Sequence, residues 1–173
     1  MKKLLLLFLI ICVCSLFSTG QILKKRKKPV LPPLTTEEIS AESLWRRITV
    51  EEDYEKYPFW SDHKGLHPGQ SPHGLYHKIY IHPYLSKALP VLEGQLPDGS
   101  IVVKVNMDTN ENITAYTIMA KVKGYNPEAN DWFWAKLDAE GNEQVSGKVS
   151  PCIECHSALD SNDYIIVHRI NRK

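Results

Sequence analysis

The chain has 173 residues and a formal net charge of +1, and 43% of its residues are hydrophobic and 24% are charged. This composition excludes a disordered chain and a protein with many membrane spans, and the length suits one domain with its own core. Because the charge is nearly balanced, it gives no indication of a polyanionic partner, and no nucleic acid is expected as a ligand.

The N-terminus has the features of an export signal. Lys2 and Lys3 precede an apolar run over residues 4–17, and Ser18-Thr19-Gly20 supplies the small residues of a cleavage site. We therefore predict that residues 1–20 are a signal peptide and that the protein is periplasmic. The alternative is an uncleaved segment that anchors the protein in the inner membrane, because the basic block at residues 24–28 resists translocation.

The region up to residue 74 is expected to contain a linker, a helix and a loop. Residues 21–35 are basic and rich in proline, which predicts an extended linker and leaves 36–173 as the folded domain. Thr36 followed by two glutamates resembles a helix start, and apolar residues then recur at helical spacing, so a helix is predicted over 36–48. Residues 51–74 are rich in Pro, Gly, Asp and His, which predicts a long ordered loop.

From residue 75 onward the hydrophobic pattern has a period of two, which is typical of strands. Turn sequences are present at 97–99 and 139–142, and a short helix is predicted over 84–89. The predicted strands cover residues 75–82, 101–106, 114–123, 132–137 and 163–170. Short strands joined by turns predict an α+β domain that is mainly antiparallel β.

One motif near the C-terminus carries recognisable chemistry. Cys152, Cys155 and His156 form a Cys-Ile-Glu-Cys-His sequence, which is the attachment pattern of a c-type haem. On one helical turn, cysteines three positions apart can each reach a porphyrin vinyl group, and the adjacent histidine can bind the iron. The motif therefore predicts one covalently attached haem c on a C-terminal helix, with His156 as the proximal iron ligand.

Two other interpretations of the motif stay open. A redox-active dithiol would require a βαβ setting, and a zinc site would require a fourth ligand, for which His168 is one of few candidates. The methionines Met1, Met107 and Met119 all precede the motif, so the downstream methionine ligand of small electron-transfer cytochromes is missing. The predicted strands do not fit a four-helix-bundle cytochrome, and a strand-rich domain with a late haem helix remains.

From about residue 60 to residue 169 the chain resembles the cytochrome P-460 family, which includes the β-rich cytochromes c-prime. The matching segments, in order, are Ser71-Pro72-His73-Gly74, Ile79-Tyr80-Ile81-His82-Pro83, residues 96–104, Gly124-Tyr125, residues 131–134, the haem motif and Asp163-Tyr164. The resemblance implies an antiparallel β fold, a homodimer and a haem with an open distal side. Known members oxidise hydroxylamine or bind nitric oxide.

The resemblance also singles out three further residues. Lys104 matches the lysine that bonds to a porphyrin meso carbon in hydroxylamine-oxidising members, although strand alternation alone is equally satisfied by a solvated lysine. His73 stands where the family has an apolar distal residue, so it could bond to a ligand, close the sixth coordination position or only pack in its loop. Arg169 is a weaker candidate for the haem pocket or for a propionate partner.

Two functional hypotheses follow. The first is an exported haem protein that binds or oxidises a small nitrogen species, hydroxylamine or nitric oxide. The protein would be an enzyme, an oxidoreductase, only if it oxidises hydroxylamine. The alternative is a six-coordinate electron-transfer cytochrome with His73 on the iron. A redox partner protein is expected, because oxidation and electron transfer both need one. Trp132 and Trp134 alternate with Phe133 and are predicted as core, whereas the remaining histidines lack ligand spacing and are predicted at the surface: His63, His67, His77 and His82.

Overall fold

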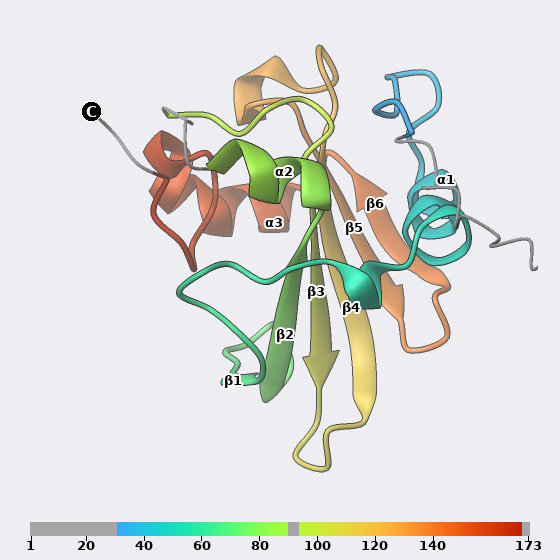
Figure 1. Cartoon of the computed structure of the whole chain (residues 1–173), viewed down its shortest axis with the longest axis vertical. Helices are drawn as coiled ribbons and strands as arrows, with labels where there is room; N and C mark the ends of the chain where they lie inside the picture. The colour runs from blue at the N-terminus through green and yellow to red at the C-terminus, as the bar shows by residue number, and fades with distance from the viewer. Residues whose placement is uncertain (1–30, 90–93, 171–173) are drawn as a thin grey trace, which may run out of the picture. The chain divides into compact units, whose positions relative to one another are not determined.

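A computed structural model describes residues 31–89 and 94–170, so the predicted signal peptide, its cleavage site and most of the linker lie outside the described residues. Six strands form one antiparallel sheet in which each strand pairs with the next along the chain (Figure 1). The strands are β1 His67–Pro68, β2 Tyr76–Ile81, β3 Ile101–Met107, β4 Ile113–Lys121, β5 Trp132–Asp138 and β6 Glu143–Gly147. The helices are α1 Ala41–Arg46, α2 Pro83–Ala88 and α3 Ser150–His156, with shorter turns η1 Arg47–Glu51, η2 Tyr54–Lys56, η4 Pro127–Ala129 and η5 Ser157–Asn162. The predicted α+β class, mainly antiparallel β with a C-terminal helix, is confirmed.

The first helix begins later than predicted. Thr36 lies in a turn, and the helix starts after Ser40, whose side chain accepts a hydrogen bond from the backbone N–H of Ser43. The Ser43 hydroxyl in return accepts from the backbone N–H of Ser40. The two bonds satisfy the backbone N–H groups of Ser40 and Ser43, so the helix starts there. The Thr36 hydroxyl bonds to the Glu37 side chain instead and caps no helix. The helix then continues as the π-helical turn η1.

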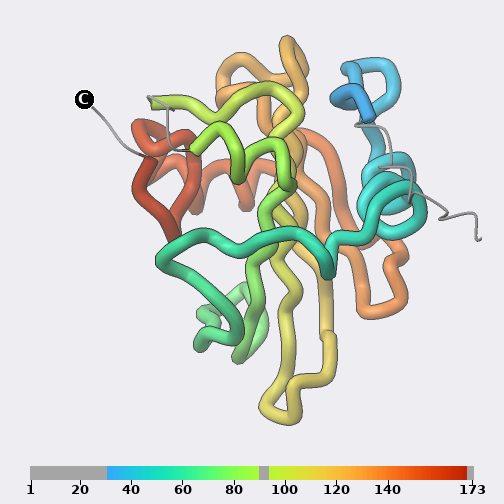
Figure 2. Tube along the Cα trace, viewed as in Figure 1, coloured from blue at the N-terminus to red at the C-terminus, as the bar shows by residue number. Residues whose placement is uncertain are grey.

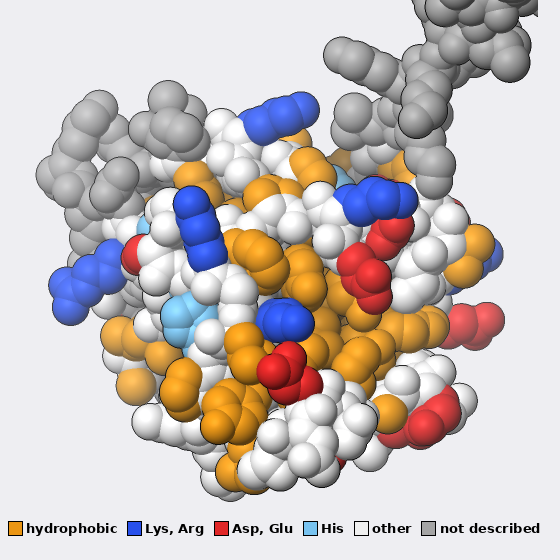
Figure 3. Space-filling model, turned by 60° about the horizontal axis from the view of Figure 1, so that its bottom comes forward, with side chains coloured by type: hydrophobic (Ala, Val, Ile, Leu, Met, Phe, Trp, Pro, Cys, Tyr) orange, Lys and Arg blue, Asp and Glu red, His pale blue; other side chains and the backbone are white. Residues whose placement is uncertain are grey.

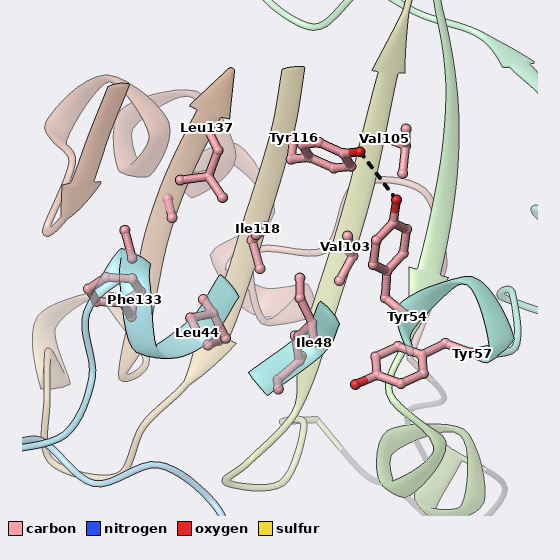
Figure 4. Packing of buried hydrophobic residues seen from close by; sticks show 14 of the residues in the cluster. Leu44, Ile48, Tyr54, Tyr57, Val103, Val105, Tyr116, Ile118, Phe133 and Leu137 are labelled. Carbon is pink, nitrogen blue, oxygen red and sulfur yellow. Dashed lines mark hydrogen bonds between the residues drawn. The ribbon is translucent and has the colours of Figure 1, made fainter. Parts of the chain in front are cut away.

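One face of the sheet packs against α1 and η1. Leu44 and Ile48 are completely buried against alternate side chains of β3, β4 and β5 (Figure 4). Each such side chain stabilises the fold by about 1.5–3 kcal/mol through the apolar surface that it removes from water. The turn between β5 and β6 closes against the same helix, because a Cβ on Gly141 would lie 2.5 Å from the Trp45 ring.

The opposite face of the sheet forms a second core. Trp60 and Trp132 are completely buried there, together with Met119, Trp134 and Ile81. Residues of α2, α3 and the C-terminal segment pack on this face, so each face of the sheet carries a hydrophobic core. The prediction that Trp132 and Trp134 alternate with Phe133 and supply core is confirmed. Phe133 belongs to the first core, and the two tryptophans belong to the second.

The predicted long loop crosses the first face before it reaches β2 (Figure 2). Its Pro58 carbonyl accepts a hydrogen bond from the Ile81 N–H, and the Phe59 ring packs 4.7 Å from that of Tyr80. Only the 3₁₀ turn η2 and the two-residue strand β1 interrupt it. The loop therefore ties the α1 side of the domain to β2, the strand that carries His77.

Two assignments near the C-terminus were wrong. Residues 143–147 form the unpredicted edge strand β6, and the strand predicted over 163–170 is instead a series of turns and bends. The side chain of Asn162 takes the place of a neighbouring strand there, because it donates to the carbonyls of Ile165 and His168 and accepts from the N–H of Ile170. Tyr164 has φ +64°, which is also incompatible with a strand.

Candidate haem site

Helix α3 presents the Cys-Ile-Glu-Cys-His motif beside the second core. Pro151 stands in its first turn, where a missing N–H costs nothing, and the helix is anchored through Cys152 and Ile153. The Cys152 thiol is half-buried and that of Cys155 is exposed, and neither forms a disulfide with another described cysteine. Burial raises the pKa of Cys152, while the charge of Lys136 acts in the opposite direction. Both thiols are therefore available for reaction from one turn of helix.

His156, the last residue of α3, is held in one orientation. Its Nδ1 lies 2.8 Å from the carbonyl oxygen of Tyr164, and since a carbonyl can only accept, Nδ1 carries the proton. Its ring also packs against Trp134, with 4.9 Å between the ring centroids. Burial lowers the pKa of His156, the Tyr164 bond opposes this and the charge of Lys104 adds to it. The imidazole is thus a neutral tautomer whose Nε2 is left to bind iron.

Lys104 extends from the centre of β3 on the same face of the sheet as the site. Its side chain is half-buried, and burial lowers its pKa to about 8. The charge of this one ammonium lowers the pKa of each of four histidines, which are His63, His73, His77 and His156. The structure thus brings Lys104 into the same cluster as the predicted proximal ligand, and its bond to the porphyrin stays a prediction.

His73 reaches the site from the loop before β2. The loop lies directly on β3, because a Cβ on Gly74 would be 2.7 Å from the Met107 carbonyl oxygen. The Nδ1 atom of His73 lies 3.4 Å from the Thr117 hydroxyl, and its ring stands 6.4 Å from that of His156 at an interplanar angle of 82°. Burial, followed by the charges of Lys104 and His156, lowers the pKa of His73 to about 4, so the ring is neutral at neutral pH.

The residues of this region fit a haem. Four buried polar atoms on the second face of the sheet have no hydrogen-bond partner among the described residues: Trp60 Nε1, His77 Nδ1, Asn106 Oδ1 and Trp134 Nε1. Unpaired polar atoms of this kind cost about 1–3 kcal/mol each, so several of them on the face that carries His156 favour a bound group or water there. Together with an oriented histidine and two adjacent thiols, they form a suitable donor set for a c-type haem.

Sequence analysis missed a cluster of three histidines. His63, His67 and His77 were predicted at the surface, but His77 is only 5% exposed, so that prediction was wrong for it. The Nε2 atoms of His63 and His77 are 2.8 Å apart, and the ring of His67 stacks 3.7 Å from that of His63. Strand alternation did place His77 on one face with Ile79 and Ile81, and this was the only signal available from the sequence.

The other candidates lie elsewhere. Arg169 is exposed in the segment after η5, outside any strand, and its predicted role at the haem stays a prediction. His168, a possible fourth zinc ligand, instead lies 2.6 Å from Asp62 and stacks on Trp60. His82 caps α2 by accepting from the Tyr84 N–H. Within residues 31–89 and 94–170, no group of three His, Cys, Asp or Glu side chains is arranged to hold a metal ion.

Comparison with known proteins agrees with this geometry. No curated protein matches the chain. The family model described as Cytochrome P460 matches residues 51–167, a range that begins at the end of η1 and includes the whole sheet, His73, Lys104 and the haem motif. The match covers well over half of the sequence and agrees with the resemblance read from its motifs. The chain therefore belongs to the cytochrome P460 family, whose members bind haem.

Proposed function

We propose that this chain is an exported c-type haem protein that binds or oxidises a small nitrogen species, hydroxylamine or nitric oxide. Cys152 and Cys155 would hold one haem through thioether bonds, and His156 would be the proximal ligand. The observation that carries the proposal is the hydrogen bond from His156 Nδ1 to the Tyr164 carbonyl, which leaves Nε2 unprotonated next to two thiols. Family membership and the spacing of the motif support the same assignment.

The bound haem would supply a metal site for the ligand and would accept its electrons. The surrounding residues supply polarity and exclude water. Lys104 offers an amine of lowered pKa, and Thr117 and Asn106 offer a hydroxyl and an amide joined by a 3.2 Å hydrogen bond. The ring of Trp134 packs against that of His156, the residue that would hold the haem iron. Hydroxylamine oxidation releases protons with its electrons, so neutral groups that accept a proton are suited to this pocket.

One observation favours a second function, a six-coordinate electron-transfer cytochrome. A metal–nitrogen bond is about 2 Å long, and the centre of an imidazole ring lies roughly 1 Å beyond the bonded nitrogen. Two imidazoles that bind one metal ion from opposite sides therefore have ring centroids about 6 Å apart. The rings of His73 and His156 are 6.4 Å apart, and each has its Nδ1 near a fixed acceptor or hydroxyl. His73 is thus a candidate sixth ligand.

Ligand binding distinguishes the two functions. The natively matured protein is reduced and mixed with carbon monoxide or nitric oxide while its Soret band is recorded. An open or weakly closed distal site gives a prompt shift, and the absence of a shift would overturn the nitrogen-species function. His73→Ala is the matched variant: it accelerates binding strongly if His73 occupies the sixth position and changes it little if His73 only packs in its loop.

Export, partners and assembly are part of the same proposal. Covalent haem attachment outside the bacterial cytoplasm requires export, so we expect a periplasmic mature protein that begins near Gln21 and exceeds its chain mass by one haem. An intact Met1 in the membrane fraction would favour the anchored alternative. In the described part of the chain, no helix is both long enough and apolar enough to cross a membrane.

We propose that the surface of the domain binds a second copy of the chain and a redox partner protein. Large apolar side chains remain exposed on the domain, among them Val50, Leu75 and Ile166, which are 72%, 62% and 52% exposed. Apolar side chains also gather across the face seen in Figure 3, with acidic and basic groups between them. Such a mixed surface supports association with another protein. Sedimentation of the haem-loaded protein at several concentrations tests the dimer.

A further inference from the structure

We propose that His77 and His63 form a proton path between the haem pocket and solvent. This inference rests on the proposed oxidation of hydroxylamine. Each hydroxylamine oxidised to nitroxyl gives two electrons and two protons (NH2OH → HNO + 2H⁺ + 2e⁻). The electrons would leave through the haem to a one-electron acceptor protein, and the protons require a separate exit from a pocket that excludes water.

His77 has the geometry of the inner member of such a path. Its ring is 5% exposed, and its Nδ1 has no hydrogen-bond partner among the described residues. Its other nitrogen, Nε2, lies 2.8 Å from Nε2 of His63. An imidazole can take up a proton at one nitrogen and release another proton from its second nitrogen, because the two neutral tautomers are close in energy. His77 therefore offers one nitrogen to the interior and one to its neighbour.

The inner end of the path lies at the haem pocket. His77 is paired across the sheet with Asn106, whose Oδ1 is also buried without a partner among the described residues. The Asn106 amide donates to the Thr117 hydroxyl at 3.2 Å, and that hydroxyl lies 3.4 Å from His73. Polar groups thus continue across β4, β3 and β2. Two unpaired atoms on facing residues are the kind of pair that a bound water bridges.

The outer end lies at the surface beside β1. His63 is half-buried, and the ring of His67 stacks on it at 3.7 Å. The register of β1 with β2 places His67 directly opposite His77, and His63 contacts both rings from the loop before β1.

The charged groups around the path favour neutral rings. Lys104 on β3 lowers the pKa of both His63 and His77, with burial as the larger cause in each case, and His67 adds to the effect. His73 lowers the pKa of His77 further, and Asp62 alone opposes the shift at His63. A neutral ring can accept a proton and pass one on, whereas a permanently charged ring cannot accept one.

The path can be tested without substrate. The haem of the mature protein is reduced by a flash photoreductant, and proton uptake from solvent is followed with a pH-indicator dye. Wild-type protein is expected to take up a proton in step with haem reduction. His63→Ala and His77→Gln should delay that uptake about tenfold or more while haem reduction keeps its rate. Added imidazole should restore the rate in His63→Ala, whose site is partly open. His168→Gln, which removes a histidine outside the path, is the matched control and should behave as wild type.

Substrate turnover gives the second measurement. Oxidation of hydroxylamine by His63→Ala should slow by a similar factor and acquire a larger solvent isotope effect, while carbon monoxide binding, which moves no proton, stays unchanged. His63→Ala keeps the test valid if a change at the buried His77 impairs folding. Proton uptake at the wild-type rate in both variants would overturn the path, as would the absence of any uptake in wild type. A wild-type protein that takes up protons through His63 but does not oxidise hydroxylamine would overturn the proposed substrate and keep the path.

Discussion

Lys121 and Asp163 form a buried ion pair next to the residue whose carbonyl orients His156. The Lys121 Nζ lies 2.7 Å from both carboxylate oxygens of Asp163, and the two side chains are 4% and 0% exposed. Asp163 also accepts from the Leu96 N–H at 2.7 Å, and its carbonyl accepts from Trp132 Nε1 at 3.0 Å. The next residue, Tyr164, supplies the carbonyl that holds His156. The ion pair thereby ties the turn at Asp163 and Tyr164 to Lys121 of β4, and the orientation of His156 depends on that turn.

Breaking this ion pair should be costly. Lys121→Met leaves the buried Asp163 carboxylate without its cation, so we expect the free energy of unfolding to fall by about 3–5 kcal/mol. Urea unfolding followed by circular dichroism measures the change. Lys123→Met, two positions along at an exposed site, is the control and should lie close to wild type. Equal stability of the two variants would contradict the role assigned to the pair.

Acid should weaken the fold partly through Glu52. Burial raises the pKa of Glu52, but hydrogen bonds from His82 and Tyr57 outweigh it and hold that pKa below the ordinary value of 4.5. A carboxyl with a lowered folded-state pKa stabilises the fold above its unfolded pKa, and that contribution is lost as pH falls through the folded pKa. The stability difference between wild type and Glu52→Gln should therefore be largest at neutral pH and shrink below about pH 4.5. Glu55→Gln, at an exposed site, is the matched control in the same unfolding measurements.

Lys104 should bond to the porphyrin if the protein oxidises hydroxylamine. Burial lowers its pKa to about 8, so a far larger fraction of the amine is neutral and nucleophilic than in a solvated lysine. We expect a reduced Soret band far to the red of an ordinary c-type spectrum, and haem that stays attached to a Lys104 peptide after proteolysis. Lys104→Met should restore an ordinary spectrum and abolish hydroxylamine oxidation while both thioethers persist. An ordinary wild-type spectrum would exclude the bond and favour nitric oxide binding or electron transfer.

The two cysteines should each carry one thioether. Cys152→Ser and Cys155→Ser are each expected to keep a haem that is attached at one vinyl group only, which shifts the pyridine haemochrome band. When Lys104 is also replaced by Met, the double variant, which lacks both cysteines, should lose its haem under denaturing conditions, and its mass should equal that of the chain alone. Haem that remains attached in the double variant would assign the attachment to another residue, for which Lys104 is the first candidate.

Local sequence patterns were sufficient to predict most of the sheet and the C-terminal helix that carries the Cys-Ile-Glu-Cys-His motif. Strand alternation predicted β2 to β5 and separated Phe133 from Trp132, because neighbouring residues of a strand point to opposite faces. Turn residues with the required backbone freedom predicted the turn at Gly99, which has φ +82°. The haem motif was readable because its chemistry depends on residues only four positions apart along a single helix. These features are determined over short stretches of chain.

Only the tertiary structure decided how distant residues combine. The strand predicted over 163–170 was wrong because Asn162, rather than a neighbouring strand, satisfies that backbone. The ion pair of Lys121 with Asp163 and the contact of His63 with His77 join residues that are 42 and 14 positions apart. The sequence around these residues predicts neither contact. A lysine or histidine on a strand fits the same alternating pattern whether its side chain faces water or the interior. These residues are buried because distant segments fold over the second face of the sheet. Patterns among neighbouring residues do not predict which distant segments will cover that face.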